Sequence, residues 1–246
     1  MRVLVTGAAG YIGAAVVAAL ETEHWIRCVD VRPMPAPARG ESLVADLVRY
    51  ENAALACQEV DAVIHLAFVH PGSPVAYPSP DIPMSGTVTP TANLFEAAQQ
   101  AGIKRFVLMS SGAVVTGYSR DTHIHVGLPH NFRGLYPLSK SLQERIAEQY
   151  ASEYGMTVVA LRPWSVVDGR LSQHKHGEAL RRNDPSYFGF ICRHDLAEAC
   201  RLALSAPLTG FQPFHLMATA PGRQTFDVGR TEHLLGWVPK ETFSDL

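Results

Sequence analysis

A tyrosine and a lysine stand four positions apart in the segment Tyr136-Pro137-Leu138-Ser139-Lys140. If this segment opens a helix, the two side chains share one face of it. A nearby ammonium favours the phenolate, so we expect Lys140 to lower the pKa of Tyr136 and make it a general base. The alternative interpretation is an exposed pair on a surface helix.

A serine pair, Ser110-Ser111, follows the apolar stretch 104–109, which we predict to be a buried strand. Doubly wound folds gather their ligands at the carboxyl ends of strands. A hydroxyl there can hold a substrate oxygen while Tyr136 takes its proton. Either serine could instead merely end the strand, and the local sequence does not separate Ser110 from Ser111.

A glycine-rich stretch near the N-terminus could hold the cofactor that such chemistry needs. It runs Val3-Leu4-Val5-Thr6-Gly7-Ala8-Ala9-Gly10-Tyr11-Ile12-Gly13, an apolar strand, a glycine turn and the start of a helix. Gly7 permits the tight turn, Gly10 lets the backbone approach a pyrophosphate, and Gly13 lets helix and strand pack closely. The free N–H groups of the helix start suit an anion. This context favours dinucleotide binding over an ordinary turn.

An acid stands where a dinucleotide site needs one. Asp30 ends a second predicted strand, Trp25–Val29, about 20 residues beyond the glycines. Its carboxylate can accept the ribose hydroxyls of NAD and would repel the 2′-phosphate of NADP. We therefore predict NAD, with Arg32 as the nearby residue that could accommodate a phosphate.

The elements that must position these groups alternate along the chain. Predicted strands cover Ser42–Val44, Ala62–Leu66, Lys104–Met109, Thr157–Leu161 and Phe214–Met217. Predicted helices cover Ala14–Leu20, Arg49–Gln58, Thr91–Ala101, Tyr136–Tyr154 and His194–Ser205, the last capped by Asp195. Residues 69–90, with six prolines, and residues 117–134 read as loops. The pattern predicts an α/β fold with a doubly wound parallel (Rossmann) sheet at 1–163 and a small C-terminal substrate lobe at 164–246, packed on the same domain.

Composition excludes other classes of function. With 246 residues the chain can bury a large core and suits one α/β domain. Its formal charge is −2 and its basic residues are scattered, so it shows no nucleic-acid footprint. We expect no signal peptide, no membrane span, and four buried thiols in a cytoplasmic protein. Its histidines, such as His123, His125, His174 and His176, lack metal-site spacing, so we expect no metal. The predicted partner is a small molecule, and the sequence leaves a homo-oligomer open.

The chain resembles the extended short-chain dehydrogenase/reductase superfamily, in its NAD-dependent epimerase/dehydratase branch. Besides the glycine stretch, the matching motifs are Asp30, Asp46-Leu47, His65-Leu66-Ala67, Ser110-Ser111, Tyr136–Lys140, Arg193–Ala199 and Leu235–Pro239. The resemblance implies that Gly7, Gly10, Tyr11, Ile12, Gly13, Asp30, Asp46, Leu47, Leu66 and Ala67 bind the cofactor. It implies Ser111, rather than Ser110, as the catalytic serine. Lys140 would contact the nicotinamide ribose as well as tune Tyr136.

Departures from the family pattern narrow the reaction. Dehydratases of this branch carry an Asp-Glu pair after the catalytic hydroxyl, where this chain has Gly112-Ala113, so we reject a dehydratase. The family's asparagine-rich motif is replaced by 87–91, Thr-Val-Thr-Pro-Thr, which leaves an asparagine-supported proton relay without its residue. The short chain after Trp164 resembles the uronate dehydrogenase subgroup, which oxidises a sugar acid at its ring hemiacetal carbon.

Candidate substrate contacts follow the fourth and sixth predicted strands. They are Ser73, Trp164, Ser165 and one arginine of a basic segment, Arg170, Arg181 or Arg182, as a carboxylate clamp. Their alternatives are a turn residue, a core tryptophan and a solvated basic face. The predicted function is an NAD-dependent oxidoreductase of a small, sugar-like substrate, such as a uronic acid. The alternatives are a sugar or nucleotide-sugar epimerase and a non-catalytic dinucleotide sensor.

Overall fold

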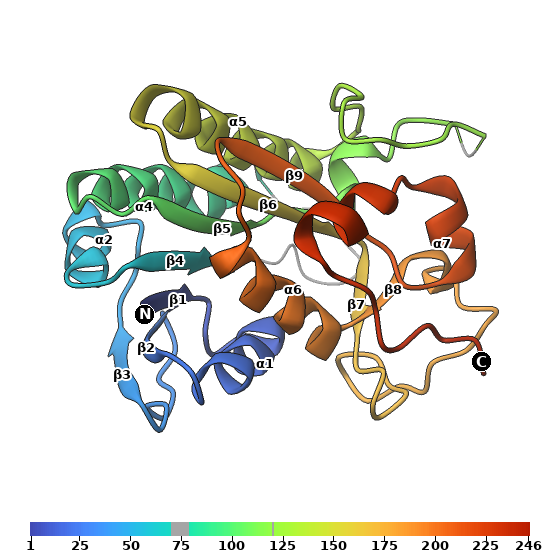
Figure 1. The fold of residues 1–246 in the computed structure, drawn as a ribbon, viewed down its shortest axis with the longest axis horizontal. Helices are drawn as coiled ribbons and strands as arrows, with labels where there is room; N and C mark the ends of the chain where they lie inside the picture. The colour runs from blue at the N-terminus through green and yellow to red at the C-terminus, as the bar shows by residue number, and fades with distance from the viewer. Residues whose placement is uncertain (70–78, 120) are drawn as a thin grey trace.

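A computed structural model describes residues 1–69, 79–119 and 121–246 as a three-layer α/β fold (Figure 1). Within those residues, seven parallel strands form the central sheet in the order β3-β2-β1-β4-β5-β6-β9. They are β1 (Arg2–Thr6), β2 (Trp25–Asp30), β3 (Gly40–Val44), β4 (Ala62–His65), β5 (Arg105–Met109), β6 (Thr157–Pro163) and β9 (Phe211–Leu216). The strand order reverses between β1 and β4, where doubly wound folds bind their ligands. The predicted fold class is confirmed.

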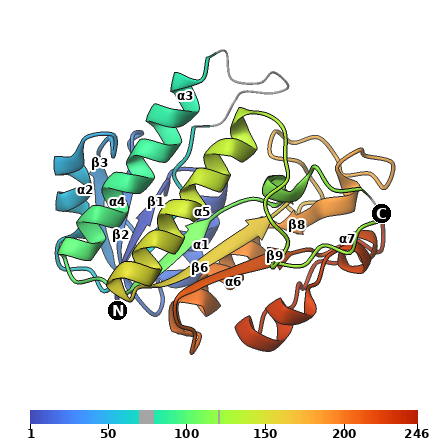
Figure 2. The same cartoon turned by 90° about the horizontal axis from the view of Figure 1, so that it is seen from above.

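Helices cover both faces of the sheet (Figure 2). On one face lie α2 (Tyr50–Cys57), α4 (Thr89–Gln100) and α5 (Leu135–Tyr154), and on the other lie α1 (Tyr11–Leu20) and α6 (Arg193–Ser205). Successive strand residues point to opposite faces. In β1, Leu4 therefore enters one hydrophobic core while Val3 and Val5 enter the other. Burial on both faces explains why these strands are continuously apolar.

The C-terminal part of the chain contributes to the main sheet as well as to a small separate one. Strands β7 (Ser165–Val167) and β8 (Phe190–Cys192) pair with each other, and the sequence did not predict them. The short helical segment η3 (Tyr187–Gly189) directly precedes β8, and two more, α7 (Ala220–Thr225) and the π-helical η4 (Thr231–Leu235), follow β9. Helix α6 packs against α1, and β9 pairs with β6. The division at residues 163 and 164 stays a prediction.

One predicted loop is partly helical. Within 69–90, the structure has α3 (Asp81–Pro83) and the π-helical η1 (Met84–Val88), which run directly into α4. Pro80 precedes α3 and Pro90 lies in the first turn of α4, positions where proline is tolerated. The loop prediction was wrong for this part because these prolines mark helix starts rather than breaks.

The predicted cap of α6 was also wrong. The helix begins at Arg193, and the Asp195 carboxylate accepts the backbone N–H groups of Lys240 at 3.0 Å and Glu241 at 2.9 Å. The indole N–H of Trp237 donates to the carbonyl of Asp195 at 2.7 Å. Asp195 therefore anchors the C-terminal tail on α6.

The four cysteines are free and buried, as predicted. Burial raises the pKa of the Cys57 and Cys200 thiols to about 12, which makes both unreactive. No helix in the described ranges has the length and apolar character that a bilayer crossing requires.

Candidate functional site

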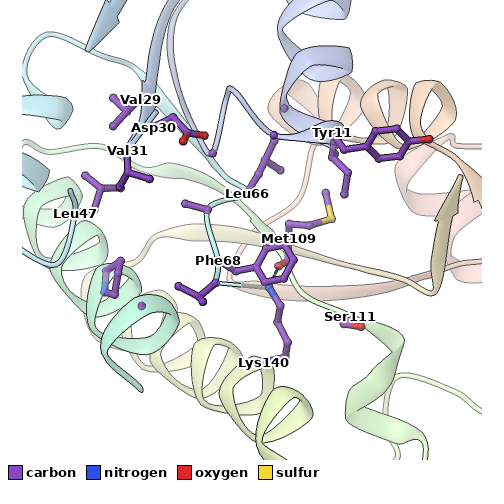
Figure 3. A pocket seen from close by; sticks show the side chains of 18 of the residues that line it. Tyr11, Val29, Asp30, Val31, Leu47, Leu66, Phe68, Met109, Ser111 and Lys140 are labelled. Carbon is purple, nitrogen blue, oxygen red and sulfur yellow. Dashed lines mark hydrogen bonds between the residues drawn. The ribbon is translucent and has the colours of Figure 1, made fainter. Parts of the chain in front are cut away.

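A cavity of about 850 Å³ lies along the carboxyl ends of the strands (Figure 3). Every cofactor residue implied by the family resemblance lines it: Gly7, Gly10, Tyr11, Ile12, Gly13, Asp30, Asp46, Leu47, Leu66 and Ala67. Ser111, Tyr136 and Lys140 line the same cavity. In Figure 3 the side chains of Asp30 and Leu47 lie at one end, and those of Lys140 and Ser111 at the other. The structure thus brings the two predicted groups of residues into one elongated site.

The turn leaves no room for a side chain at Gly7 or Gly13. Gly7 has a φ of +71°, and a Cβ there would lie 2.8 Å from the backbone nitrogen of Ala67. A Cβ on Gly13 would lie 2.2 Å from the carbonyl oxygen of Gly7. Helix α1 starts directly after Gly10, so its free N–H groups face the cavity end of the turn. This bare, electropositive turn fits a dinucleotide pyrophosphate.

At the end of β2, the Asp30 carboxylate is fixed by backbone and side-chain donors. It accepts the N–H of Ala9 at 3.1 Å and the N–H of Arg32 at 3.0 Å. The Arg32 guanidinium lies beside it, with Nε 3.4 Å from Asp30 Oδ1 and Nη2 donating to the carbonyl of Ala9 at 2.8 Å. Asp30 is buried while the Arg32 side chain is 62% exposed, so the guanidinium can move away while the backbone N–H groups still hold the carboxylate.

The predicted catalytic residues meet where α5 passes the end of β5. The Ser111 hydroxyl lies close enough to the Tyr136 phenol to lower its pKa. Lys140 is buried, donates from Nζ to the carbonyl of Met109 at 2.9 Å, and lies 4.7 Å from the centre of the Phe68 ring. Tyr136 and Lys140 therefore sit in the core of the site, which excludes the alternative of an exposed surface pair.

The pKa of Tyr136 differs from the sequence-based expectation. Burial raises the pKa of Tyr136, and the neighbouring Ser111 hydroxyl offsets this only in part. Burial also lowers the pKa of Lys140 to about 7, so the lysine is only partly charged at neutral pH. The net direction expected for the pKa of Tyr136 is therefore wrong for the chain by itself, because burial disfavours charge on both groups.

The two neighbouring serines have different surroundings. Ser110 donates its hydroxyl to the buried carboxylate of Glu144, whereas Ser111 accepts the N–H of Ala113 at 3.1 Å and lies close enough to Tyr136 to lower its pKa. Both serines line the cavity, but the Ser110 hydroxyl is already donated to Glu144, which favours Ser111 as the partner of Tyr136 at a ligand oxygen. Its catalytic role stays a prediction.

Trp164 forms a fixed wall of the cavity. Its indole is packed so tightly that a Cβ on Gly189 would lie 2.2 Å from Cδ1 and a Cβ on Gly112 would lie 2.6 Å from Cε3. Rings of Phe188 and Phe226 contact it edge-on at 5.8 and 5.7 Å. Trp164 is thus both a core residue and a cavity wall.

The other predicted substrate contacts that the structure describes are not found at the cavity. Ser165 on β7 and the three arginines, Arg170, Arg181 and Arg182, do not line the cavity in the part of the chain that the structure describes. Arg182 instead donates to the carbonyl of Ser244 at 3.1 Å. Ser73 lies outside the described residues.

Lys175, which belongs to the same basic segment, does line the cavity, although the sequence analysis proposed only arginines there. Its place among those arginines is the sequence feature that could have indicated it. The same described ranges hold no group of histidines, cysteines and acids that could bind a metal ion.

Comparison with known proteins agrees with this geometry. Residues 3–182 match the profile of the NAD dependent epimerase/dehydratase family. A 3-beta-hydroxysteroid dehydrogenase of Mycolicibacterium neoaurum is 34% identical over 170 residues, 66% of this chain and 46% of that protein. A uronate dehydrogenase of Pseudomonas syringae pv. tomato is 32% identical over 165 residues, 65% of this chain and 58% of that protein. The matched segment thus spans only about half the length of these curated relatives.

Among solved structures, a glucuronic acid dehydrogenase from Chromohalobacter salexigens superposes with a TM-score of 0.81 at 26% identity. The superposition covers 99% of this chain and 86% of that one. The small C-terminal part therefore has a counterpart in that structure as well as the sheet.

Proposed function

The chain belongs to the NAD dependent epimerase/dehydratase family, and on that premise we propose that it oxidises a small sugar acid, such as a uronic acid, with NAD. The observation that carries the proposal is the meeting of Ser111, Tyr136 and Lys140 in the same cavity that the glycine turn and Asp30 line. Relatives named for hydroxysteroid and uronate oxidation support a dehydrogenase.

In this proposal each residue of the site has a defined task. Asp30 holds the adenosine ribose, and Asp46 and Leu47 border the adenine. Lys140 holds the nicotinamide ribose, and its ammonium form stabilises the Tyr136 phenolate. When bound, NAD supplies the hydride acceptor and a positive charge. Ser111 and Tyr136 bind the reacting hydroxyl, and Tyr136 takes its proton as phenolate. The carbon loses its hydride at the same time, so a ring hemiacetal becomes a lactone.

The substrate's carboxylate would pair with Lys175 rather than with an arginine of the same segment. Lys175 lines the cavity and is exposed to it, whereas Arg170, Arg181 and Arg182 lie elsewhere. An ammonium at that position favours an anionic over a neutral sugar. The Trp164 wall, held between two glycines, favours a free sugar acid over a bulkier nucleotide sugar.

A substrate panel tests the proposal. Free uronic acids, the matching neutral sugars and UDP-sugars are each incubated with NAD, and reduced nicotinamide is followed by absorbance. We expect the uronic acids to be oxidised with the highest kcat/KM. Lys175→Met should raise KM for the uronic acid and spare the neutral sugar, whereas the matched control Arg182→Met should change neither. Epimerisation of a UDP-sugar without net NADH would support the epimerase alternative.

A cytoplasmic location is part of the proposal. The four thiols are reduced and buried, as in proteins of a reducing compartment. Fractionation of cells that express the chain with its native N-terminus would test it, with recovery among periplasmic or secreted proteins as the opposing result.

A further inference from the structure

A carboxylate lies buried one helical turn beyond Lys140. Tyr136, Lys140 and Glu144 follow each other at four-residue steps on α5, so they share one face of the helix. Glu144 is only 2% exposed. A buried carboxylate stays ionised only when several donors compensate for the lost water.

Three side chains, those of Arg162, Ser110 and His130, surround the Glu144 carboxylate. The Arg162 guanidinium donates to both of its oxygens, from Nε to Oε1 at 2.8 Å and from Nη2 to Oε2 at 2.6 Å. Ser110 donates to Oε1, and the His130 ring lies 3.2 Å from Oε2. Burial raises the pKa of Glu144, but these hydrogen bonds outweigh it and hold the pKa well below its usual range. The carboxylate is therefore charged wherever Lys140 titrates.

The same contacts tie together the three segments that carry the site. Ser110 precedes Ser111 at the end of β5, and Glu144 lies on α5 with Tyr136 and Lys140. Arg162 lies in β6, two residues before the cavity wall at Trp164. A displacement of Glu144 would therefore break contacts to both β5 and β6 as well as move part of α5.

We propose that Glu144 is a positioning residue: it sets a fixed negative charge one helical turn from Lys140 and ties the ends of β5 and β6 to α5 around the site. The inference rests on the proposed roles of Tyr136 and Lys140. The phenolate form of Tyr136 needs a neighbouring ammonium, and a fixed negative charge behind Lys140 stabilises that ammonium.

The charged and titratable neighbours of this pair can be named. Lys140 faces Tyr136 and Glu144 on its own helix, His65 from β4, the Met109 carbonyl from β5 and the Phe68 ring. Around Glu144 lie Arg162 from β6, His130 and Ser110 from loops, and His215 from β9. Burial lowers the pKa of Lys140, and Glu144 is the group whose charge raises it.

A titration without substrate tests the proposal. The chain has four lysines, Lys104, Lys140, Lys175 and Lys240, so protein labelled with ¹³C at lysine Cε gives a simple NMR spectrum that Lys140→Met assigns. Glu144→Gln should lower the titration midpoint of Lys140 by about one pH unit. The matched control Glu148→Gln removes an exposed carboxylate of the same helix and should leave the midpoint unchanged.

A second variant guards against loss of the fold. Glu144→Gln leaves Arg162 unpaired in the interior, which can unfold a protein. Glu144→Gln combined with Arg162→Gln removes both charges. It should still lower the Lys140 midpoint, because Glu144 is the charge that offsets burial there. An unchanged midpoint in either folded variant, or unfolding of both, would overturn the proposal. A failed sugar-acid assay would leave the titration result standing.

Discussion

Replacing His215 by leucine should protect the protein against acid. The side chain is fully buried on β9, and within the described ranges neither ring nitrogen has a hydrogen-bond partner. Its ring meets the edge of Phe226 at 5.0 Å. Burial lowers its pKa from 6.5 to about 3, so the imidazole is neutral in the folded protein at pH values where the unfolded chain already protonates it.

Between those two pKa values the unfolded state binds one proton more than the folded state. The free energy of unfolding therefore falls as the pH falls, by about 1.4 kcal/mol per pH unit. From about pH 6.5 to about pH 5, this amounts to roughly 2 kcal/mol for His215. Burial lowers the pKa of His65 to about 3 as well, so His65 should contribute a similar loss. His215→Leu should remove about half of the combined acid sensitivity of these two histidines.

Urea unfolding followed by circular dichroism at neutral and acidic pH measures this difference. At neutral pH the leucine variant should be at least as stable as the wild type, since it removes two unpartnered polar atoms from the core. His176→Leu, a change at an exposed histidine, is the matched control and should keep the wild-type pH dependence. An equal loss of stability in His215→Leu and the wild type would refute the reasoning.

Three further changes probe the cavity. Asp30→Ala should weaken NAD binding about 10-fold or more, because it removes a charged hydrogen-bond acceptor. The same change should tighten NADP binding, because it frees the Arg32 guanidinium. Calorimetry with both cofactors measures this, and an unchanged preference for NAD over NADP would mean that Asp30 has no such role. Gly13→Ala places a Cβ 2.2 Å from the carbonyl oxygen of Gly7, so it should lower Tm and abolish NAD binding. A wild-type Tm in thermal unfolding would contradict the close approach of these two residues. Trp164→Ala should raise kcat/KM for bulkier sugars relative to the free uronic acid, whereas Trp164→Phe should not; equal selectivity would mean that the indole serves only the core.

The parts that the sequence predicted well depend on local pattern. The glycine turn, the apolar strands and the Tyr136–Lys140 spacing are properties of short segments, and the structure places them as expected. The position of a loop side chain depends instead on contacts between distant residues. Bridges of Asp168 with Gln173 and of Gln173 with Ala179 shape the loop that presents Lys175 to the cavity, and no sequence period reports them.

Charge states in the site were also beyond the sequence. The pKa of Tyr136 depends on how deeply the fold buries its ring, which is a property of the whole structure. Asp195 was predicted as a helix cap because aspartate favours that position. Its actual donors, the N–H groups of Lys240 and Glu241, lie more than 40 residues away.

Transfer of deuterium from a uronic acid labelled at its hemiacetal carbon tests the central claim most directly. With wild-type protein and NAD, the label should appear in the reduced nicotinamide, one equivalent for each lactone formed. Tyr136→Phe should bind NAD normally and lose the transfer about 10²–10⁴-fold, the usual worth of a general base. Label that stays in the sugar, or a Tyr136→Phe variant that transfers it at the wild-type rate, would contradict the proposed function.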